Sequence, residues 1–157
     1  MVIREYRPED CEELEELLRL FYDTVHTVNA KDYTKEQLDA WAADSPNREE
    51  WNRSLLRHYS LVAEEHGRII GFGDLRKDGL LHRLFVHRDC QRKGAARAVC
   101  GRLEQMFEGE IPTFASITAK PFFEKRGYAV VKEQTVMRNG IPLKNFLMKK
   151  TRTTKFI

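Results

Sequence analysis

Three short segments between residues 60 and 87 constrain the fold of this chain more than any other feature. Their apolar side chains follow the two-residue period of β-strands rather than the period of a helix. The segments span residues 60–64, 68–76 and 80–87. Turn residues separate them, and the second turn ends in Asp78-Gly79, a strong hairpin signal. The pattern predicts three consecutive antiparallel strands.

Helical periodicity precedes this strand region. Apolar residues recur there at three- and four-residue steps, as on the buried stripe of an amphipathic helix, at Cys11, Leu14, Leu18, Phe21, Val25 and Val28. We expect the helix to begin at Pro8 or at Asp10, with Glu13 completing a capping box, and its Leu14–Leu18–Phe21 stripe to enter the core. Residues 29–47 are mixed, with a cap signal at Thr34, and residues 49–58 predict a second helix.

Helix and strand alternate again after residue 94. The predicted elements are a helix with Ala96, Val99, Leu103 and Met106 on one face, a strand at 113–117, a short helix at 119–126 closed by Gly127, and strands at 128–136 and 143–149 around Asn139-Gly140. With a first strand at residues 2–6, the order is β-α-α-β-β-β-α-β-α-β-β. This order is an α+β fold with a mixed sheet. We expect one domain over residues 1–150 and a basic tail over residues 151–157.

Composition excludes several classes of protein. The chain has 157 residues, with 27 Lys and Arg against 24 Asp and Glu, so its net charge does not indicate nucleic-acid binding. No apolar run approaches about 18 residues, which predicts no membrane span. The N-terminus is charged from Arg4 onward, which predicts no signal peptide. Cys11, Cys90 and Cys100 form no metal-binding pattern with histidine, so we expect no metal site and free thiols in the cytoplasm.

The segment from Leu84 to Arg97 carries the clearest chemical signal. An apolar strand ends, a polar loop follows, and a helix begins near Gly94. The free N–H groups of a helix N-terminus can cradle a phosphate, and Gly94, Ala95 and Ala96 would allow close approach of its oxygens. Residues 83–102 hold six Lys or Arg side chains against one Asp, which favours a polyanionic ligand. The alternative is a solvated basic turn before a surface helix.

The motif Gln91-Arg92-Lys93-Gly94-Ala95-Ala96 resembles the Q/R-x-x-G-x-G/A pyrophosphate loop of the GCN5-related N-acetyltransferase superfamily. A second segment, Pro121-Phe122-Phe123-Glu124-Lys125-Arg126-Gly127-Tyr128, is similar to the short-helix signature of that superfamily. The order of elements matches it over essentially the whole chain. Residues 26–41 further resemble a branch of small bacterial acetyltransferases.

The resemblance implies the fold and the cofactor site. It implies a mostly antiparallel sheet of six to seven strands, flanked by about four helices, in which the fourth and fifth strands splay apart. Acetyl-CoA or coenzyme A would bind between them, with its pantetheine arm against the fourth strand. A backbone N–H of Phe85 or a neighbour would polarise the thioester carbonyl. The implied cofactor-binding residues are Leu84, Phe85, Val86, Gln91, Arg92, Lys93, Gly94, Ala95, Ala96, Arg97, Ser116, Phe122, Phe123 and Lys125.

One residue departs from the family pattern. Phe123 stands where many family members have a tyrosine that protonates the departing thiol, and phenylalanine has no proton to give. A thiol with a pKa of about 8.5 costs only about 2 kcal/mol to release as thiolate near neutral pH. We expect a slower or differently assisted step rather than loss of activity.

The attacking amine needs a base, because only about one in two thousand lysine-like amines is unprotonated at pH 7. His82 is the first candidate, since alternation along its strand would put it on the same face as Leu84. The alternative for His82 is an ordinary solvent-facing histidine. Asp74 on the preceding strand is the competing candidate base, or else a polar outward residue. His87 is expected near phosphate or water, and His58 and His66 are expected on the surface.

The acceptor pocket of such a fold is walled by the first helices and their connection. His26, Asn29, Tyr33 and Trp41 fall in this region and are the candidate substrate-binding residues. The alternative is that these side chains pack the helices together, with Tyr33 and Trp41 in the core.

Two functions from different classes follow from the resemblance. The first is an N-acetyltransferase that moves the acetyl group of acetyl-CoA to a primary amine of a small molecule or peptide, by direct attack in a ternary complex. The alternative, suggested by Phe123, is a CoA-binding regulatory module with little or no catalysis. We expect no nucleic-acid partner, because no aromatic stacking residues interleave the basic ones, and no membrane partner; a homodimer is compatible with the sequence.

Overall fold

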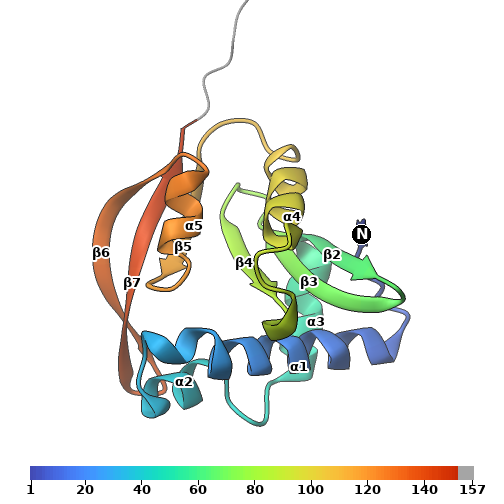
Figure 1. Cartoon of the computed structure of the whole chain (residues 1–157), viewed down its shortest axis with the longest axis horizontal. Coiled ribbons are helices and arrows are strands. Elements are labelled where there is room, and N and C mark those ends of the chain that lie inside the picture. The colour runs from blue at the N-terminus through green and yellow to red at the C-terminus, as the bar shows by residue number, and fades with distance from the viewer. Residues whose placement is uncertain (152–157) are drawn as a thin grey trace, which may run out of the picture.

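A computed structural model describes residues 1–151, apart from the side chain of Cys11 (Figure 1). The basic tail after residue 151 and the Cys11 thiol therefore lie outside the described residues. The helices are α1 (Cys11–Thr27), α2 (Lys35–Trp41), α3 (Arg48–Arg57), α4 (Ala95–Glu104) and α5 (Lys120–Lys125), with short 3-10 turns η1 (Asn29–Lys31) and η2 (Arg88–Cys90). The strands are β1 (Val2–Glu5), β2 (Tyr59–Glu65), β3 (Arg68–Leu75), β4 (Leu81–Val86), β5 (Ile111–Ser116), β6 (Tyr128–Arg138) and β7 (Ile141–Lys150).

The seven strands form one sheet in the order β1-β2-β3-β4-β5-β7-β6. Every neighbouring pair is antiparallel except β4 and β5, which run parallel and pair at Leu81 and Thr113 alone. There the Thr113 hydroxyl donates a 2.9 Å hydrogen bond to the Leu81 carbonyl. Beyond this point the strands diverge, and Figure 1 shows the β5–β7 half standing apart from β4. The expected α+β class, the mostly antiparallel sheet and the splayed strand pair are confirmed.

The two faces of the sheet are covered by different helices. Leu61 and Ala63 of β2 pack with Val99 of α4 and Phe123 of α5. Val62, between them in the strand, packs on the opposite face with residues of α1 such as Leu17. Since successive strand side chains point to opposite faces, α4 and α5 cover one face and α1 covers the other. Helix α1 also crosses both halves of the sheet (Figure 1).

The N-terminus of α1 differs in detail from the expected capping box. Asp10 does cap the helix, accepting a hydrogen bond from the Glu12 N–H at 3.0 Å. The buried Glu13 carboxylate does not complete the box; it accepts from the Arg4 guanidinium and from the Arg7 N–H. A cation within reach is a stronger partner for a carboxylate than a backbone amide. Leu18 is buried, and Leu14 and Phe21 pack partly buried against the core, as expected.

Helix α2 is an addition to the expected order of elements. Its seven residues begin at the predicted Thr34 cap, where Thr34 and Gln37 form a complete capping box with hydrogen bonds of 3.2 and 2.8 Å. So short a helix makes two turns and shows little periodicity. The described chain therefore has five α-helices where about four were expected.

Candidate active site

The loop between β4 and α4 has the geometry of an anion cradle. Gly94 caps α4 with φ +90°, and a Cβ at this position would meet no atom within 4 Å, so the space in front of the helix is open. Arg92 also has positive φ, +61°. Together they turn the chain so that α4, ten residues long, presents its N-terminal N–H groups outward. Arg92, Lys93 and Arg97 are exposed around this end.

Gln91 and Ala95 support this loop from its inner side and do not extend their side chains toward a ligand. The Gln91 amide donates to the carbonyls of Val86 and His87, at 2.7 and 3.3 Å, so its nitrogen holds the loop together. Ala95 is buried in the core beneath α4, which leaves only its backbone to face a ligand. The exposed Lys125 lies on α5, next to Phe122 and Phe123.

Successive backbone N–H groups of β4 point alternately toward β3 and toward the gap beside β5. The His87 N–H donates to the Ile70 carbonyl at 2.8 Å, which makes these residues a hydrogen-bonded pair. Such pairs alternate along an antiparallel ladder, so Phe85, paired with Phe72, directs its N–H toward β3. Leu84 directs its N–H away from β3, into the gap beside β5. The N–H that faces the gap is therefore that of Leu84, a neighbour of Phe85, and not that of Phe85 itself.

A β-bulge in the β3–β4 ladder changes the faces of the β4 side chains. Asp74 pairs with Arg83 and Leu75 pairs with Leu81, which leaves His82 without a pairing residue of its own. The extra residue interrupts the alternation of side chains. Leu84 packs toward α4, whereas His82 and Arg83 both lie toward Asp74. The expectation that His82 and Leu84 share a face is therefore wrong.

The gap between β4 and β5 opens into a cavity of about 640 Å³. Its walls come from β4, β5, the β6–β7 hairpin and the helices α1, α2, α3 and α5. The wall residues include His82, Leu84, Phe114, Ser116, Phe123 and Asn145. A second cavity of about 530 Å³, lined by residues of α1 and the segment from α2 to α3, shares Phe21, Trp41, Asn47 and Trp51 with it. The two cavities therefore lie next to each other, separated by these shared side chains.

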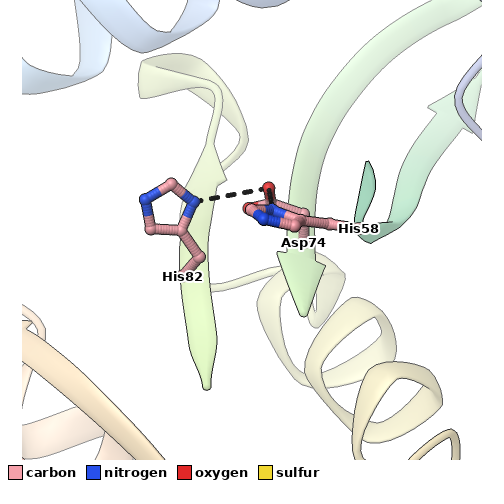
Figure 2. Close-up of side chains that lie close together, drawn as sticks. All are labelled: His58, Asp74 and His82. Atoms are coloured by element: carbon pink, nitrogen blue, oxygen red, sulfur yellow. Dashed lines mark hydrogen bonds and ion pairs between the residues drawn. The ribbon is translucent and has the colours of Figure 1, made fainter. Parts of the chain in front are cut away.

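Next to this cavity, the buried carboxylate of Asp74 lies between the imidazoles of His58 and His82 (Figure 2). Asp74 has no exposed surface. Its Oδ2 lies 2.7 Å from Nδ1 of His58, at the end of α3, and 3.5 Å from Nδ1 of His82 on β4. The Arg83 guanidinium donates to both carboxylate oxygens at 2.6 to 3.2 Å, donates to Ser54 at 2.7 Å, and stacks 4.4 Å from the centre of the Trp51 ring.

This environment keeps Asp74 ionised. Burial by itself would raise its pKa, but hydrogen bonds from His58, His82 and Arg83 and the charge of Arg83 outweigh burial and hold the pKa of Asp74 well below its usual range. Asp74 itself does not line the cavity, and its carboxylate lies within 3.5 Å of both imidazoles. Of the two candidate bases, His82 is therefore the one that borders the cavity.

Only part of the expected histidine arrangement is correct. His82 is 41% exposed and lines the cavity. His58 was expected on the surface, yet its side chain is only 14% exposed and bound to Asp74. No local sequence pattern predicts this contact, because Asp74 lies 16 residues further along the chain, on β3. His66 is 93% exposed, as expected, and His87 accepts the Asp89 N–H at 3.1 Å and lies 3.0 Å from the Arg68 guanidinium.

His58, Asp74 and His82 also have the composition of a metal site, with ligand atoms within 4.8 Å of one another. The bound Arg83 argues against that use. Its guanidinium already neutralises Asp74 and occupies both carboxylate oxygens, and a divalent cation placed beside it would be repelled.

The candidate acceptor residues divide into two groups. His26 bonds to the Ala42 carbonyl at 2.8 Å, and the buried Asn29 lies 3.5 Å from the Ser116 hydroxyl, so both connect elements of the fold rather than line the cavity. The buried Tyr33 donates to the Lys144 carbonyl at 2.7 Å and accepts the Ile117 N–H at 2.9 Å. Trp41 is half-buried and lines both cavities.

The sequence interpretation missed several cavity residues that lie far from any motif. Trp51 of α3 and Arg138 and Asn145 of the β6–β7 hairpin line the larger cavity. The hairpin is held against the helices by Gln37, whose amide donates to the Pro142 carbonyl at 2.9 Å.

No helix among the described residues has the length and apolar character needed to cross a membrane.

Comparison with known proteins identifies the family. The model of the acetyltransferase (GNAT) domain matches residues 29–151. The chain is 34% identical, over 147 residues, to the protein named uncharacterized N-acetyltransferase YafP of Escherichia coli, covering 94% of this chain and 93% of that relative.

Solved structures share the whole fold. A GCN5-related N-acetyltransferase described as aminotransferase, class-II, from Rhodopseudomonas palustris superposes with a TM-score of 0.91 at 28% identity, over 96% of this chain and 95% of the other. PaiA N-acetyltransferase from Thermoplasma acidophilum, in complex with coenzyme A, gives 0.78 at 19% identity, over 96% and 98%. The chain belongs to the GNAT acetyltransferase family, which confirms the expected acetyltransferase activity on amines with acetyl-CoA as the acetyl donor.

Proposed function

We propose that the protein acetylates a primary amine of a small molecule or peptide by direct attack on acetyl-CoA in a ternary complex. The observation that carries this proposal is the cavity between β4 and β5, into which both the Leu84 N–H and the His82 imidazole face. An oxyanion donor and a base beside the same space are the two groups that acyl transfer to an amine requires.

In this proposal the cofactor occupies the α4–α5 side of the gap. Its pyrophosphate binds the N–H groups at the start of α4, where Gly94 leaves open space and the exposed Arg92, Lys93 and Arg97 add charge. Its pantetheine arm lies along residues 84–86 of β4. Phe122, Phe123 and Lys125 of α5 flank its other side, and Ser116, which lies on the face of β5 toward α1, borders its thioester end.

His82 is the general base of the proposed reaction. If Nδ1–H of His82 faces Asp74 Oδ2, the lone pair of Nε2 is left to accept a proton, as in other aspartate–histidine pairs. The amine nitrogen forms a bond with the thioester carbon and gives its proton to Nε2. The carbonyl oxygen takes up the negative charge at the Leu84 N–H. When the carbonyl re-forms, the carbon–sulfur bond breaks and the electron pair leaves on the thiolate.

Ser116 is our candidate for assisting the departing thiolate in place of a tyrosine. Its hydroxyl oxygen accepts the Ala119 N–H at 3.0 Å and lies 3.5 Å from Asn29 Nδ2. Within residues 1–151 its hydrogen has no acceptor, so it can point into the cavity that Ser116 lines. A hydroxyl is too weak an acid to protonate a thiolate, but it can stabilise the charge by a hydrogen bond.

Phe123 favours a second candidate, a CoA-binding regulatory module. Its ring is buried against Phe122 and Tyr128, with centroids 5.2 and 5.0 Å away, and offers no proton at the cavity wall. Thiol release from acetyl-CoA, measured with a colorimetric reagent against a panel of primary amines, separates the two functions. Release that depends on the amine supports the enzyme. Tight acetyl-CoA binding without such release supports the module.

Assembly and location are separate proposals. A homodimer could form through β6, which is one of the two edge strands of the sheet and exposes Val130, Val131 and Met137. Light scattering that gives the 18.4 kDa of one chain would contradict it. A cytoplasmic location fits the unpaired Cys90 and Cys100 and stays a prediction.

A further inference from the structure

The cavity contains a buried acceptor that the proposed reaction has not used. Oδ1 of Asn145, on β7, is one of two buried side-chain polar atoms that lack a hydrogen-bond partner within residues 1–151. The other is Nε of Arg126, a residue that does not line the cavity. Leaving a buried acceptor unpaired is costly, and native structures rarely keep one without a reason.

The strand faces show on which side of the sheet Asn145 lies. Phe146 packs among the core residues under α4 and α5, with the Lys120 ammonium 5.1 Å from the centre of its ring. Leu143 packs with Val25 of α1 and Leu38 of α2. Because side chains alternate along β7, Asn145 shares the face of Leu143 and α1. This face is opposite the one that carries the α4 loop.

The neighbours of Asn145 on this face also line the cavity. Asn145 pairs with Ser116 in the β5–β7 ladder, and Phe114, two residues earlier in β5, is 50% exposed. His82 reaches the same cavity from β4 because of the bulge. The unpaired oxygen and the candidate base thus border one space from opposite sides of the strand gap.

We propose that Asn145 Oδ1 accepts an N–H hydrogen bond from the acceptor amine and so orients it for attack. This inference rests on the proposed function. A primary amine has two N–H bonds besides its lone pair, so one can face His82 Nε2 and the other Asn145 Oδ1. The pantetheine arm also carries amide N–H donors. Because Asn145 lies on the α1 face of the sheet, opposite the α4 loop where the cofactor is proposed to bind, we assign its oxygen to the acceptor amine rather than to pantetheine.

The test measures binding in a dead-end complex, so that it does not depend on catalysis. Butylamine, phenethylamine, spermidine and a lysine-containing peptide are titrated by calorimetry into wild-type protein saturated with CoA, and then into Asn145→Leu and Asn145→Asp. We expect Asn145→Leu to weaken the amine that binds wild type by about tenfold, and Asn145→Asp to retain it. The affinity for CoA should stay unchanged in both variants.

The matched control is Gln134→Leu, which removes the same amide from the ladder partner of Asn145 outside the cavity lining. Amine binding should survive this change. Asn145→Leu should melt at or above the wild-type temperature, because it removes an unpaired polar atom, and this excludes misfolding as the cause of weaker binding.

Three results would overturn the proposal. They are equal amine affinity in wild type and Asn145→Leu, no binding of any of the four amines to the CoA complex, and a loss of CoA affinity alone, which would assign the N–H donor to pantetheine. Failure of the proposed function would give a result distinct from these three. Amines would bind the CoA complex and lose affinity in Asn145→Leu, but the wild-type protein would release no thiol from acetyl-CoA.

Discussion

Arg83 holds the Asp74 carboxylate from its neighbouring strand, with three hydrogen bonds of 2.6 to 3.2 Å to a group that has no contact with solvent. The same guanidinium bonds to Ser54 and stacks on Trp51. Arg83 therefore ties β3, β4 and α3 together behind His82. The cavity wall that carries the candidate base depends on this ion pair.

Replacing Arg83 with Met should destabilise the protein by about 3–5 kcal/mol, because it leaves a buried carboxylate without its cation. Urea unfolding monitored by circular dichroism measures the change. The control is Arg76→Met, which removes a surface ion pair with Asp78 and should cost at most about 1 kcal/mol. An equal loss of unfolding free energy in the two variants would show that the buried ion pair stabilises the protein no more than the surface pair does.

Asp74 should make stability fall at acid pH. Its folded-state pKa is depressed by its hydrogen bonds and by Arg83, so the unfolded chain binds the proton more readily. The stabilisation is complete above the unfolded pKa of about 3.9 and is lost as pH falls below it. The free energy of unfolding, measured between pH 7 and pH 3, should fall less steeply in Asp74→Asn than in wild type. The exposed-site variant Asp78→Asn should follow the wild-type curve more closely.

Gly94→Asp should lower acetyl-CoA affinity by at least 100-fold without unfolding the chain. The variant puts a negative charge where phosphate is expected and a side chain at φ +90°. Calorimetry with acetyl-CoA measures the loss. Gly67→Asp is a close match, since Gly67 also has positive φ and open space but lies in the β2–β3 turn. Normal affinity in Gly94→Asp would remove the phosphate assignment.

His82→Ala should lower kcat/KM most at neutral pH, by about 10²–10⁴-fold. Near pH 10 the deficit should shrink, because an amine with a pKa of about 10.4 is then largely unprotonated and needs less help from a base. The pH–rate profile with one amine substrate gives the result. His66→Ala serves as the exposed control. A pH–rate profile identical to wild type would exclude His82 from the mechanism.

Local patterns predicted the parts of this fold whose causes are local. The strands 60–87 and the loop at Gly94 follow from alternation and from glycine, and both are where the sequence indicated. The face of His82 was mispredicted because a bulge adds a residue without changing the alternating pattern around it. His58 and Asn145 gave no signal, because their surroundings come from strands that only tertiary pairing brings together.

The bulge at His82 makes the length of β4 as important as its composition. Substitutions that keep six residues in this strand leave each side chain on its present side. Deleting His82 or Arg83, the two residues between Leu81 and Leu84, would restore regular pairing but leave only one side chain from this segment beside Asp74. A substitution elsewhere in β4 can therefore leave His82 beside the Asp74 carboxylate, whereas an insertion or deletion in this strand would separate the two.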